Sequence, residues 1–284
     1  MVTPAVVAAN ELRVATSGRL VDLVKQHLAV VAIDRIGPLI ADGAITIDGR
    51  VGKINDAVEP GSILAAITLG ESLVPECVPL VVHVEDDDLV ILDKPPAMHV
   101  HPLGEHRRGT LLNALLWHAG ARPDRPWAAW RPRPAHRLDR GASGLIAIAK
   151  HAAVHDRLRG QLEDRSMHRR YRATVHGRIA SDAGTIDQPL GRDPANDYRR
   201  AIVVEGQPAI THYWVIERTP THSVVELELA TGRTHQIRAH LASLGHPIVG
   251  DVLYGAALGT TDTIELRAIE LQLNHRDRRL CCTA

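Results

Sequence analysis

The chain has 284 residues, of which 45% are hydrophobic and 23% charged, and this composition excludes disorder over most of its length. It contains no run of 18 apolar residues and no basic leader, so we expect neither a membrane span nor a signal peptide. Cys77, Cys281 and Cys282 have no metal-like spacing, which predicts a reduced, cytoplasmic protein.

The net charge is zero, but the charges are unevenly distributed along the chain. Residues 1–100 carry a net charge of −7, residues 101–180 carry +10 and residues 181–284 carry −3. A basic central segment is typical of a surface that faces a polyanion. A solvated arginine-rich face explains the same pattern, and charge alone does not decide between the two.

The first 70 residues predict a compact module of two helices and a small β unit. Apolar residues at three- and four-residue steps predict a helix over 19–31. A second apolar cluster over 33–40 predicts a helix that Gly37-Pro38 kinks or shortens. The β unit is expected as a hairpin over 44–51, turning at Asp48-Gly49, and a strand over 62–67.

After a proline-containing linker, expected over 71–81, helices and strands mix without a regular βαβ alternation. This order favours an α+β fold over a doubly wound sheet. A loop is expected over 121–134, where Pro, Arg and Trp are frequent. Strands are expected over 81–84, 89–92, 144–149, 171–176, 209–217 and 223–230, and helices over 110–118, 151–163 and 235–244.

Three polar segments stand out in this second part of the chain. In residues 135–145 (AHRLDRGASGL), Asp139 lies between Arg137 and Arg140, whose charges favour an ionised carboxylate that acts as a nucleophile or base. A turn-capping role explains an isolated Asp equally simply. Tyr171 follows arginines at a strand start, where it either stacks on a base or fills the core. Residues 230–240 (ATGRTHQIRAH) lead into a helix whose N-terminus suits an anion.

Taken together, these segments resemble the RluA/RluD-type family of RNA pseudouridine synthases. The matching motifs are H-R-L-D-x-x-[TS]-S-G-L, K-x-Y-x-A-x-V-x-G and T-G-R-T-H-Q-I-R-x-H, the last followed by G-H-P-I-x-G-D-x-x-Y-G. Residues 92–113 resemble the opening motif of the family, and the resemblance extends from about residue 82 to 275. It implies a catalytic domain over 82–284 with a mixed, mainly antiparallel sheet and flanking helices.

The resemblance also implies roles for individual residues. Asp139 is expected to act on the sugar, Tyr171 to stack on the target uracil and Arg238 to pair with Asp139. Arg137 resembles the arginine that replaces the flipped base in the RNA stack. RNA contacts are expected from the matched positions His136, Arg137, Arg140, Arg233, Thr234, His235 and Gln236.

The reaction that the resemblance implies agrees with these residue types. The glycosidic bond must break and the uracil must turn before carbon 5 joins the sugar, so the base must leave the RNA helix. A carboxylate can trap or deprotonate the sugar centre, as in glycosidases. No redox change or hydrolysis occurs, so we expect neither a metal nor an organic cofactor. The expected substrate is ribosomal RNA, with transfer RNA as the alternative, and no membrane is involved.

Residues 12–70 resemble the alpha-L RNA-binding domain in a divergent form without the usual basic excess. They lie in the acidic segment 1–100, whose net charge of −7 repels phosphate, so a structural module or one that meets a protein partner is an alternative to RNA binding. The catalytic motifs depart from the family at Ala97, where Gly is usual, and at Gly141-Ala142. These changes keep a second hypothesis open, a catalytically silent RNA-binding or ribosome-assembly factor. A hydrolase using Asp139 and a histidine is a third, although the motifs supply no second acid-base partner.

Overall fold

The computed structural model describes residues 5–6, 10–66, 73–103, 106–122, 126–255 and 263–284. The chain forms two compact units, one built from Met1–Leu80, His101–Arg133 and Ile148–His155, and the other from Val81–Val100, Pro134–Ala147 and Asp156–Ala284. The boundaries expected from the sequence, 12–70 and 82–284 with a linker over 71–81, treat each domain as one continuous stretch, and they stay a prediction.

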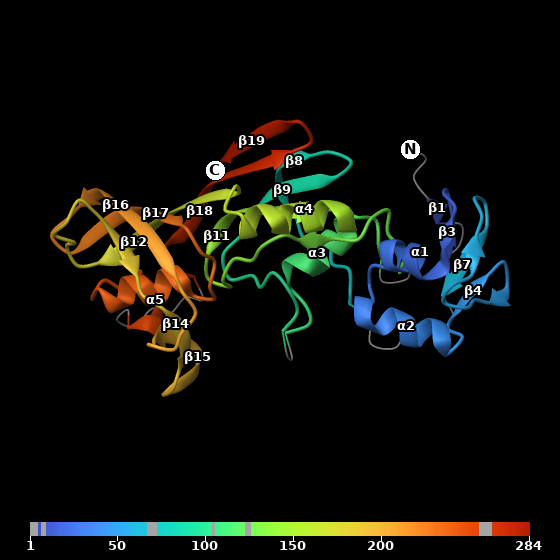
Figure 1. Ribbon diagram of the computed structural model, residues 1–284, viewed down its shortest axis with the longest axis horizontal. Coiled ribbons are helices and arrows are strands. Elements are labelled where there is room, and N and C mark those ends of the chain that lie inside the picture. Colours follow the sequence, from blue (N-terminus) through green and yellow to red (C-terminus); the bar gives the residue numbers. More distant parts are fainter. Residues whose placement is uncertain (1–4, 7–9, 67–72, 104–105, 123–125, 256–262) are drawn as a thin grey trace. The chain divides into compact units, whose positions relative to one another are not determined.

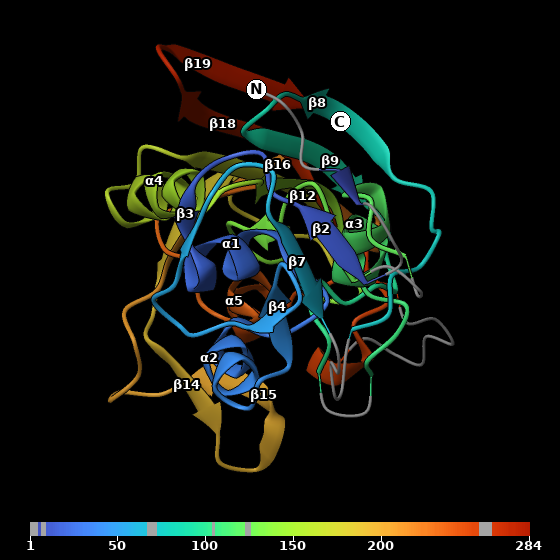
Figure 2. The ribbon, with the colours of Figure 1, turned by 90° about the vertical axis from the view of Figure 1, so that its right-hand side faces the viewer.

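The N-terminal part of the first unit combines a small antiparallel sheet with two helices. The sheet has the order β1-β2-β7-β4-β5, and Figure 2 shows β2, β7 and β4 side by side. A short ladder joins two further strands, β3 and β6. The elements are β1 (Ala5–Val6), β2 (Glu11–Arg13), β3 (Gly18–Arg19), α1 (Leu20–His27), α2 (Ile33–Ala41), β4 (Ile45–Ile47), β5 (Arg50–Val51), β6 (Ala57–Val58) and β7 (Ile63–Ala66).

The hairpin expected at Asp48-Gly49 is confirmed, because this pair connects β4 to β5. Asp48 has a φ of 49° and Gly49 a φ of 81°, as a two-residue turn between antiparallel strands requires. The strand expected over 62–67 is confirmed as β7.

The first helix prediction in this module needs correction, whereas the helix expected over 33–40 is confirmed as α2. The first helix ends at His27 instead of residue 31, because Leu28 leaves the helical conformation and bridges to Trp127, and residues 28–31 are buried in the turn that follows. The second helix is not shortened at Gly37-Pro38. It continues to Ala41, since burial of Ile36 and Ile40 stabilises the helix. Pro38 cannot donate a backbone hydrogen bond, but the carbonyl oxygen that lacks this donor lies in the exposed first turn.

The remainder of the first unit contains α3 (Leu111–His118), which the sequence predicted. Thr110 caps this helix, since its hydroxyl oxygen accepts from the Asn113 N–H at 3.3 Å and the Asn113 side chain accepts from the Thr110 N–H at 3.1 Å. The predicted loop over 121–134 is largely irregular where it is described, and residues 123–125 lie outside the described ranges. Its Trp127 is fully buried.

The second unit is built on a ten-stranded sheet with the order β13-β16-β17-β12-β18-β11-β9-β8, with β10 beside β11 and β19 beside β18 (Figure 1). Most of its ladders are antiparallel, and β11 runs parallel to β18. The strands are β8 (Val81–Glu85), β9 (Leu89–Lys94), β10 (Arg133–Pro134), β11 (Ser143–Ala149), β12 (His168–His176), β13 (Ala183–Asp187), β16 (Ile210–Arg218), β17 (His222–Leu229), β18 (Leu266–His275) and β19 (Arg278–Thr283).

Two helices and a separate hairpin accompany this sheet. The helices are α4 (Ala152–Glu163) and α5 (Gln236–Ser243), and a short 3₁₀ turn, η1 (Val252–Tyr254), follows them. The strands β14 (Leu190–Asp193) and β15 (Asn196–Ile202) pair with each other. The predicted strands and helices of this part are confirmed to within a few residues, whereas β10, β13, β14, β15, β18 and β19 were not predicted.

The α+β class with a mixed, mainly antiparallel sheet is therefore confirmed. The sheet is anchored by β9 and β11, in which residues 89–92 and 145–149 are at most 1% exposed. None of the helices in the described ranges has both the length and the apolar character needed to cross a lipid bilayer.

Candidate functional site

Most of the predicted site residues meet around one cavity of about 560 Å³ in the second unit. This volume lies within the range of pockets that hold small ligands. Of the predicted residues, Arg140 is not among those that line the cavity, and Arg238 lies behind Asp139. The predicted residues that line it are Asp139, Tyr171, His136, Arg137, Arg233, Thr234, His235 and Gln236.

The walls of the cavity are strongly basic. Five arginines line it, against two carboxylates. The positive charge of the central segment is therefore concentrated in part on this cavity, which suits an anionic ligand. The charged residues are Arg137, Arg159, Arg165, Arg169 and Arg233, with Asp139 and Glu163.

Asp139 lies in the turn between β10 and β11, and a glycine fixes the position of this turn. The Ala142 N–H donates to the Asp139 carbonyl oxygen at 3.1 Å. Gly144 pairs with Ala268 of β18 and has a φ of 108°, and a Cβ at this position would lie 2.2 Å from the Ala268 carbonyl oxygen. Only glycine permits this approach, so Gly144 brings the Asp139 turn against the centre of the sheet.

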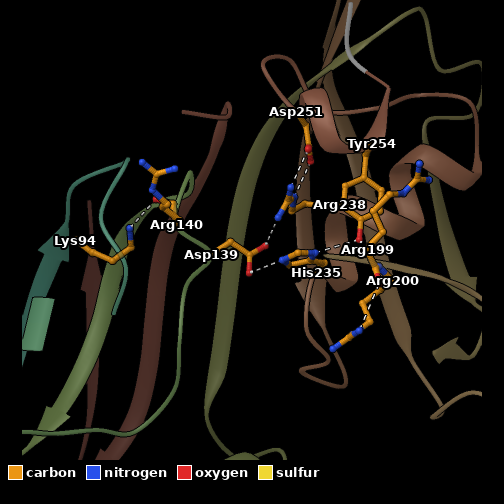
Figure 3. A network of polar contacts seen from close by, with 9 residues as sticks. All are labelled: Lys94, Asp139, Arg140, Arg199, Arg200, His235, Arg238, Asp251 and Tyr254. Atoms are coloured by element: carbon orange, nitrogen blue, oxygen red, sulfur yellow. Dashed lines mark hydrogen bonds and ion pairs between the residues drawn. The ribbon is translucent and has the colours of Figure 1, made fainter. Parts of the chain in front are cut away.

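Arg238 is held between two carboxylates at the start of α5 (Figure 3). Its Nε and Nη2 donate to the two oxygens of Asp251 at 2.7 and 2.8 Å, and its Nη1 donates to Asp139 Oδ2 at 3.3 Å. A cation in the first turn of a helix opposes the helix dipole, and burial also disfavours the charge. The hydrogen bonds to Asp251 and the charge of Asp139 outweigh burial and raise the pKa of Arg238 above its usual value. Arg238 therefore presents a fixed positive charge to Asp139.

His235 approaches Asp139 from the other side. It caps α5 in a left-handed conformation with a φ of 55°, and its Nε2 lies 3.9 Å from Asp139 Oδ1. Its Nδ1 lies 3.1 Å from Tyr254 Oη, which also accepts the Arg200 N–H at 2.8 Å. Burial lowers the pKa of His235, although the Asp139 charge opposes the shift. A neutral His235 that accepts the Tyr254 hydroxyl proton at Nδ1 directs its Nε2–H toward Asp139.

Tyr171 lies in β12, between β17 and β18, and is only 4% exposed. The register of β12 against β18 shifts between Arg170 and Tyr171, an irregularity that re-aims side chains near functional sites. Burial raises the pKa of the Tyr171 phenol, so it is neutral at physiological pH. Its ring offers an uncharged aromatic surface in the wall of the cavity.

Lys94, which we did not single out from the sequence, supports the Asp139 turn from behind. Its fully buried ammonium donates to the carbonyl oxygens of Pro95, Met98 and Arg140 at 2.7, 2.9 and 3.4 Å. Burial lowers its pKa to about 8, while the nearby Asp139 carboxylate favours the charged form. In the loop that surrounds the ammonium, Ala97 has a φ of 60°, a conformation that suits the glycine usual in the related motif.

Two of the predicted RNA contacts are engaged by the protein itself. The His136 Nε2 accepts the Ala147 N–H at 3.2 Å, and burial lowers the pKa of this imidazole to about 3. The Gln236 side chain is buried, and its Oε1 accepts from the Thr231 hydroxyl at 2.8 Å and the Arg233 N–H at 2.9 Å. These contacts give both residues a structural role in shaping the cavity.

A second polar cluster, away from this cavity, contains Asp86, Asp88 and His275, whose ligand atoms lie within 4.8 Å of one another. His275 Nε2 lies 2.8 Å from Asp86, and Arg276 Nε donates to Asp88 at 3.1 Å. Ion pairs and hydrogen bonds within the protein therefore account for this cluster.

Comparison with known proteins identifies the family of this chain. The family model described as RNA pseudouridylate synthase matches residues 88–243. The ribosomal large subunit pseudouridine synthase D of Pseudomonas aeruginosa is 41% identical over 227 residues, which cover 78% of this chain and 68% of the relative. The chain belongs to the RNA pseudouridylate synthase family. The enzyme is thus an isomerase that acts on RNA.

Two further comparisons agree with this assignment. The ribosomal large subunit pseudouridine synthase D of Nitrosomonas europaea is 36% identical over 272 residues, which cover 90% of this chain and 77% of the relative. The solved structure of human RNA pseudouridylate synthase domain containing 1 has a TM-score of 0.61 and 24% identity, covering 72% of this chain and 83% of its own. This likeness confirms the predicted pseudouridine synthase fold of the enzyme.

Proposed function

We propose that the enzyme converts specific uridines of large-subunit ribosomal RNA into pseudouridine, and that Asp139 is its catalytic residue. The choice of RNA is supported by the relatives, several of which are named as ribosomal large subunit enzymes. The role of Asp139 is supported by one observation above all. Its carboxylate lines the same cavity as the Tyr171 ring, and Arg238 pairs with it at 3.3 Å.

The geometry suits the bond changes of the isomerisation. The bond between the sugar C1′ and uracil N1 breaks, the uracil turns, and C5 bonds to C1′ while the C5 proton is lost and N1 gains a proton. Asp139 acts on the sugar, either by attacking C1′ or by removing a sugar proton. Both roles use the carboxylate, and Arg238 places a counter-charge 3.3 Å from it.

The size and lining of the cavity support an extruded base. A cavity of about 560 Å³ accommodates a nucleotide, and the neutral Tyr171 ring offers a stacking surface for the uracil. Arg137 is exposed at the same cavity, where it can take the place of the extruded base in the RNA stack. The arginines of the lining attract the phosphates on either side of the target.

The first 70 residues contribute differently in this proposal. Residues 12–70 hold six basic and six acidic side chains and so lack the positive excess that attracts phosphate, and we assign this module a structural role or a protein partner. An enzyme that modifies ribosomal RNA works in the cytoplasm, where we place this protein.

The test uses purified enzyme and three separate RNA pools. Large-subunit RNA, small-subunit RNA and transfer RNA from cells that lack the enzyme are incubated with the wild type, Asp139→Asn or Asp182→Asn, and pseudouridine is mapped chemically. Asp182 is the control because its side chain is 91% exposed. We expect new sites in large-subunit RNA with the wild type and Asp182→Asn, and none with Asp139→Asn.

Each alternative outcome would contradict one part of the proposal. New sites only in transfer RNA would overturn the ribosomal assignment. Equal modification by Asp139→Asn would overturn the role of Asp139. Binding of RNA by the wild type without any new pseudouridine would favour a catalytically silent RNA-binding factor.

A further inference from the structure

A second cavity, of about 300 Å³, lies beside the first in the same unit. Its walls come from the β14–β15 hairpin, from residues 205–207 and from the turn that leads into α5. Arg233 and Thr234 line both cavities, so the second cavity adjoins the one that contains Asp139.

The charge of this second cavity is not balanced by the protein. Arg192, Arg200 and Arg233 line it, and Glu205 is the carboxylate among its lining residues. Within the described residues, none of the three guanidinium groups has a carboxylate at ion-pair distance. Arg233 Nε donates instead to the Pro208 carbonyl oxygen at 3.1 Å. Three neighbouring cations repel one another, and an anion between them would remove this repulsion.

We propose that this cavity binds one phosphodiester group of the RNA strand directly next to the target uridine. This inference rests on the proposed function, because a flipped nucleotide stays covalently attached to the phosphates on both sides. A phosphate must therefore pass close to the mouth of the cavity that receives the base. Planar guanidinium groups donate paired hydrogen bonds to phosphate oxygens, which makes arginine well suited to this contact.

The hairpin that supplies two of these arginines is connected to the surroundings of Asp139. The Arg200 N–H donates to Tyr254 Oη at 2.8 Å, and this oxygen lies 3.1 Å from His235 Nδ1. In Figure 3 the Arg200 side chain extends away from Tyr254, so its guanidinium is not part of this connection. A phosphate held by Arg192 and Arg200 therefore has a fixed position relative to the target base. These two side chains assist binding and do not take part in the bond changes.

The test measures RNA binding over a series of salt concentrations. The proteins are the wild type, Arg192→Gln/Arg200→Gln, Arg192→Lys/Arg200→Lys, and Arg278→Gln as an exposed arginine control in the β18–β19 hairpin. The probe is the large-subunit RNA fragment that the wild type modifies. We expect the Gln pair to weaken binding by on the order of tenfold and to reduce the salt slope by about 0.7, as for one single-strand phosphate contact.

The remaining variants separate charge from geometry and from folding. The Lys pair keeps the salt slope but recovers only part of the affinity, since lysine lacks the planar fork. Arg278→Gln binds as the wild type does. The backbone bond from residue 200 to Tyr254 survives any side-chain change, so we expect unchanged melting temperatures. Binding by the Gln pair with wild-type affinity and slope would overturn the proposal.

Two further measurements identify the bound anion and distinguish failure of this inference from failure of the proposed function. With saturating enzyme, the single-turnover rate of the Gln pair should fall less than its RNA affinity, and a loss of rate without weaker binding would contradict a binding role. If inorganic phosphate binds the wild type and not the Gln pair while RNA affinity is unchanged, the cavity holds free phosphate and the proposal is wrong. Failure of the proposed function appears separately, as absence of pseudouridine with the wild type in every RNA pool.

Discussion

Replacing Asp251 by asparagine tests how Arg238 is held. The Asp251 side chain is 1% exposed and accepts two hydrogen bonds from Arg238, so the substitution removes one charge of a buried ion pair. Breaking such a pair costs about 3–5 kcal/mol. Asn keeps the shape and one acceptor oxygen, and Asp139 still lies near the guanidinium, so we expect a loss of about 3 kcal/mol in the free energy of unfolding. This corresponds to a fall in melting temperature of roughly 6–12 °C.

We expect the catalytic activity of Asp251→Asn to fall as well as its stability, but for a different reason. Without Asp251 the guanidinium has only Asp139 as a charged partner, so Arg238 and the carboxylate both shift from their positions. A misplacement of about 1 Å in a catalytic group costs roughly a hundredfold in rate. We therefore expect Asp251→Asn to lower the single-turnover rate by on the order of a hundredfold at a temperature where the variant is folded.

Urea unfolding followed by circular dichroism measures the first effect, with Asp182→Asn as the matched control. Asp182 pairs with Arg218 at 2.6 Å but is 91% exposed, so its loss should cost about 0–1 kcal/mol. If Asp251→Asn were no less stable than Asp182→Asn and retained the wild-type rate, the argument that Asp251 orients Arg238 would be refuted.

Three further predictions concern stability, each measured by urea unfolding. Gly144→Ala should destabilise by several kcal/mol or prevent folding, because its Cβ would lie 2.2 Å from the Ala268 carbonyl oxygen, and a stable variant would contradict this packing. Ala97→Gly should stabilise by roughly 0.5–1 kcal/mol by relieving the left-handed alanine, and destabilisation would count against that reading. The pKa of His136 is lowered to about 3, so the unfolded chain takes up this proton first as the pH falls below about 6.5. Wild-type stability should fall between about pH 7 and pH 5 by about 2 kcal/mol more than that of His136→Gln, and equal pH dependence would disprove the assignment.

The parts of the fold that the sequence predicted have local signals. Asp48-Gly49 specifies its hairpin by the backbone conformations that these residues allow, and Thr110 with Asn113 begins α3 by capping it. The predicted end of the first helix was wrong because its periodic apolar residues continue to Val31, whereas the chain after His27 buries them in a turn. Propensity cannot distinguish these two ways of burying the same side chains.

The strands that were missed lack such signals or combine them with an irregularity. β14 and β15 are rich in Arg and Asp and pair mainly with each other, so no apolar alternation marks them. In β18 the alternation of buried residues is broken between Ala268 and Leu271, beside the register shift against β12. A strict two-residue period therefore does not appear over its whole length.

For the site, the motifs brought together Asp139 and Tyr171, which line one cavity, and Arg238, which pairs with Asp139 from behind. The supporting residues Lys94, Asp251 and Tyr254 lie within the same matched motifs, but their roles depend on partners distant in the sequence. The charge count pointed to the segment whose arginines line the cavity, but not all of that segment faces it, because Arg131 is buried and donates to the Lys25 carbonyl oxygen at 3.1 Å.

The most direct test of the role of Asp139 is release of tritium from RNA labelled at uracil C5. Formation of the new bond between C5 and the sugar expels this hydrogen into water, so the signal reports isomerisation itself. In single turnover with large-subunit RNA, the wild type should release tritium from its target uridines, and Asp139→Asn should release none above background while still binding the RNA. Release by Asp139→Asn at the wild-type rate would contradict the assignment of Asp139 as the catalytic residue.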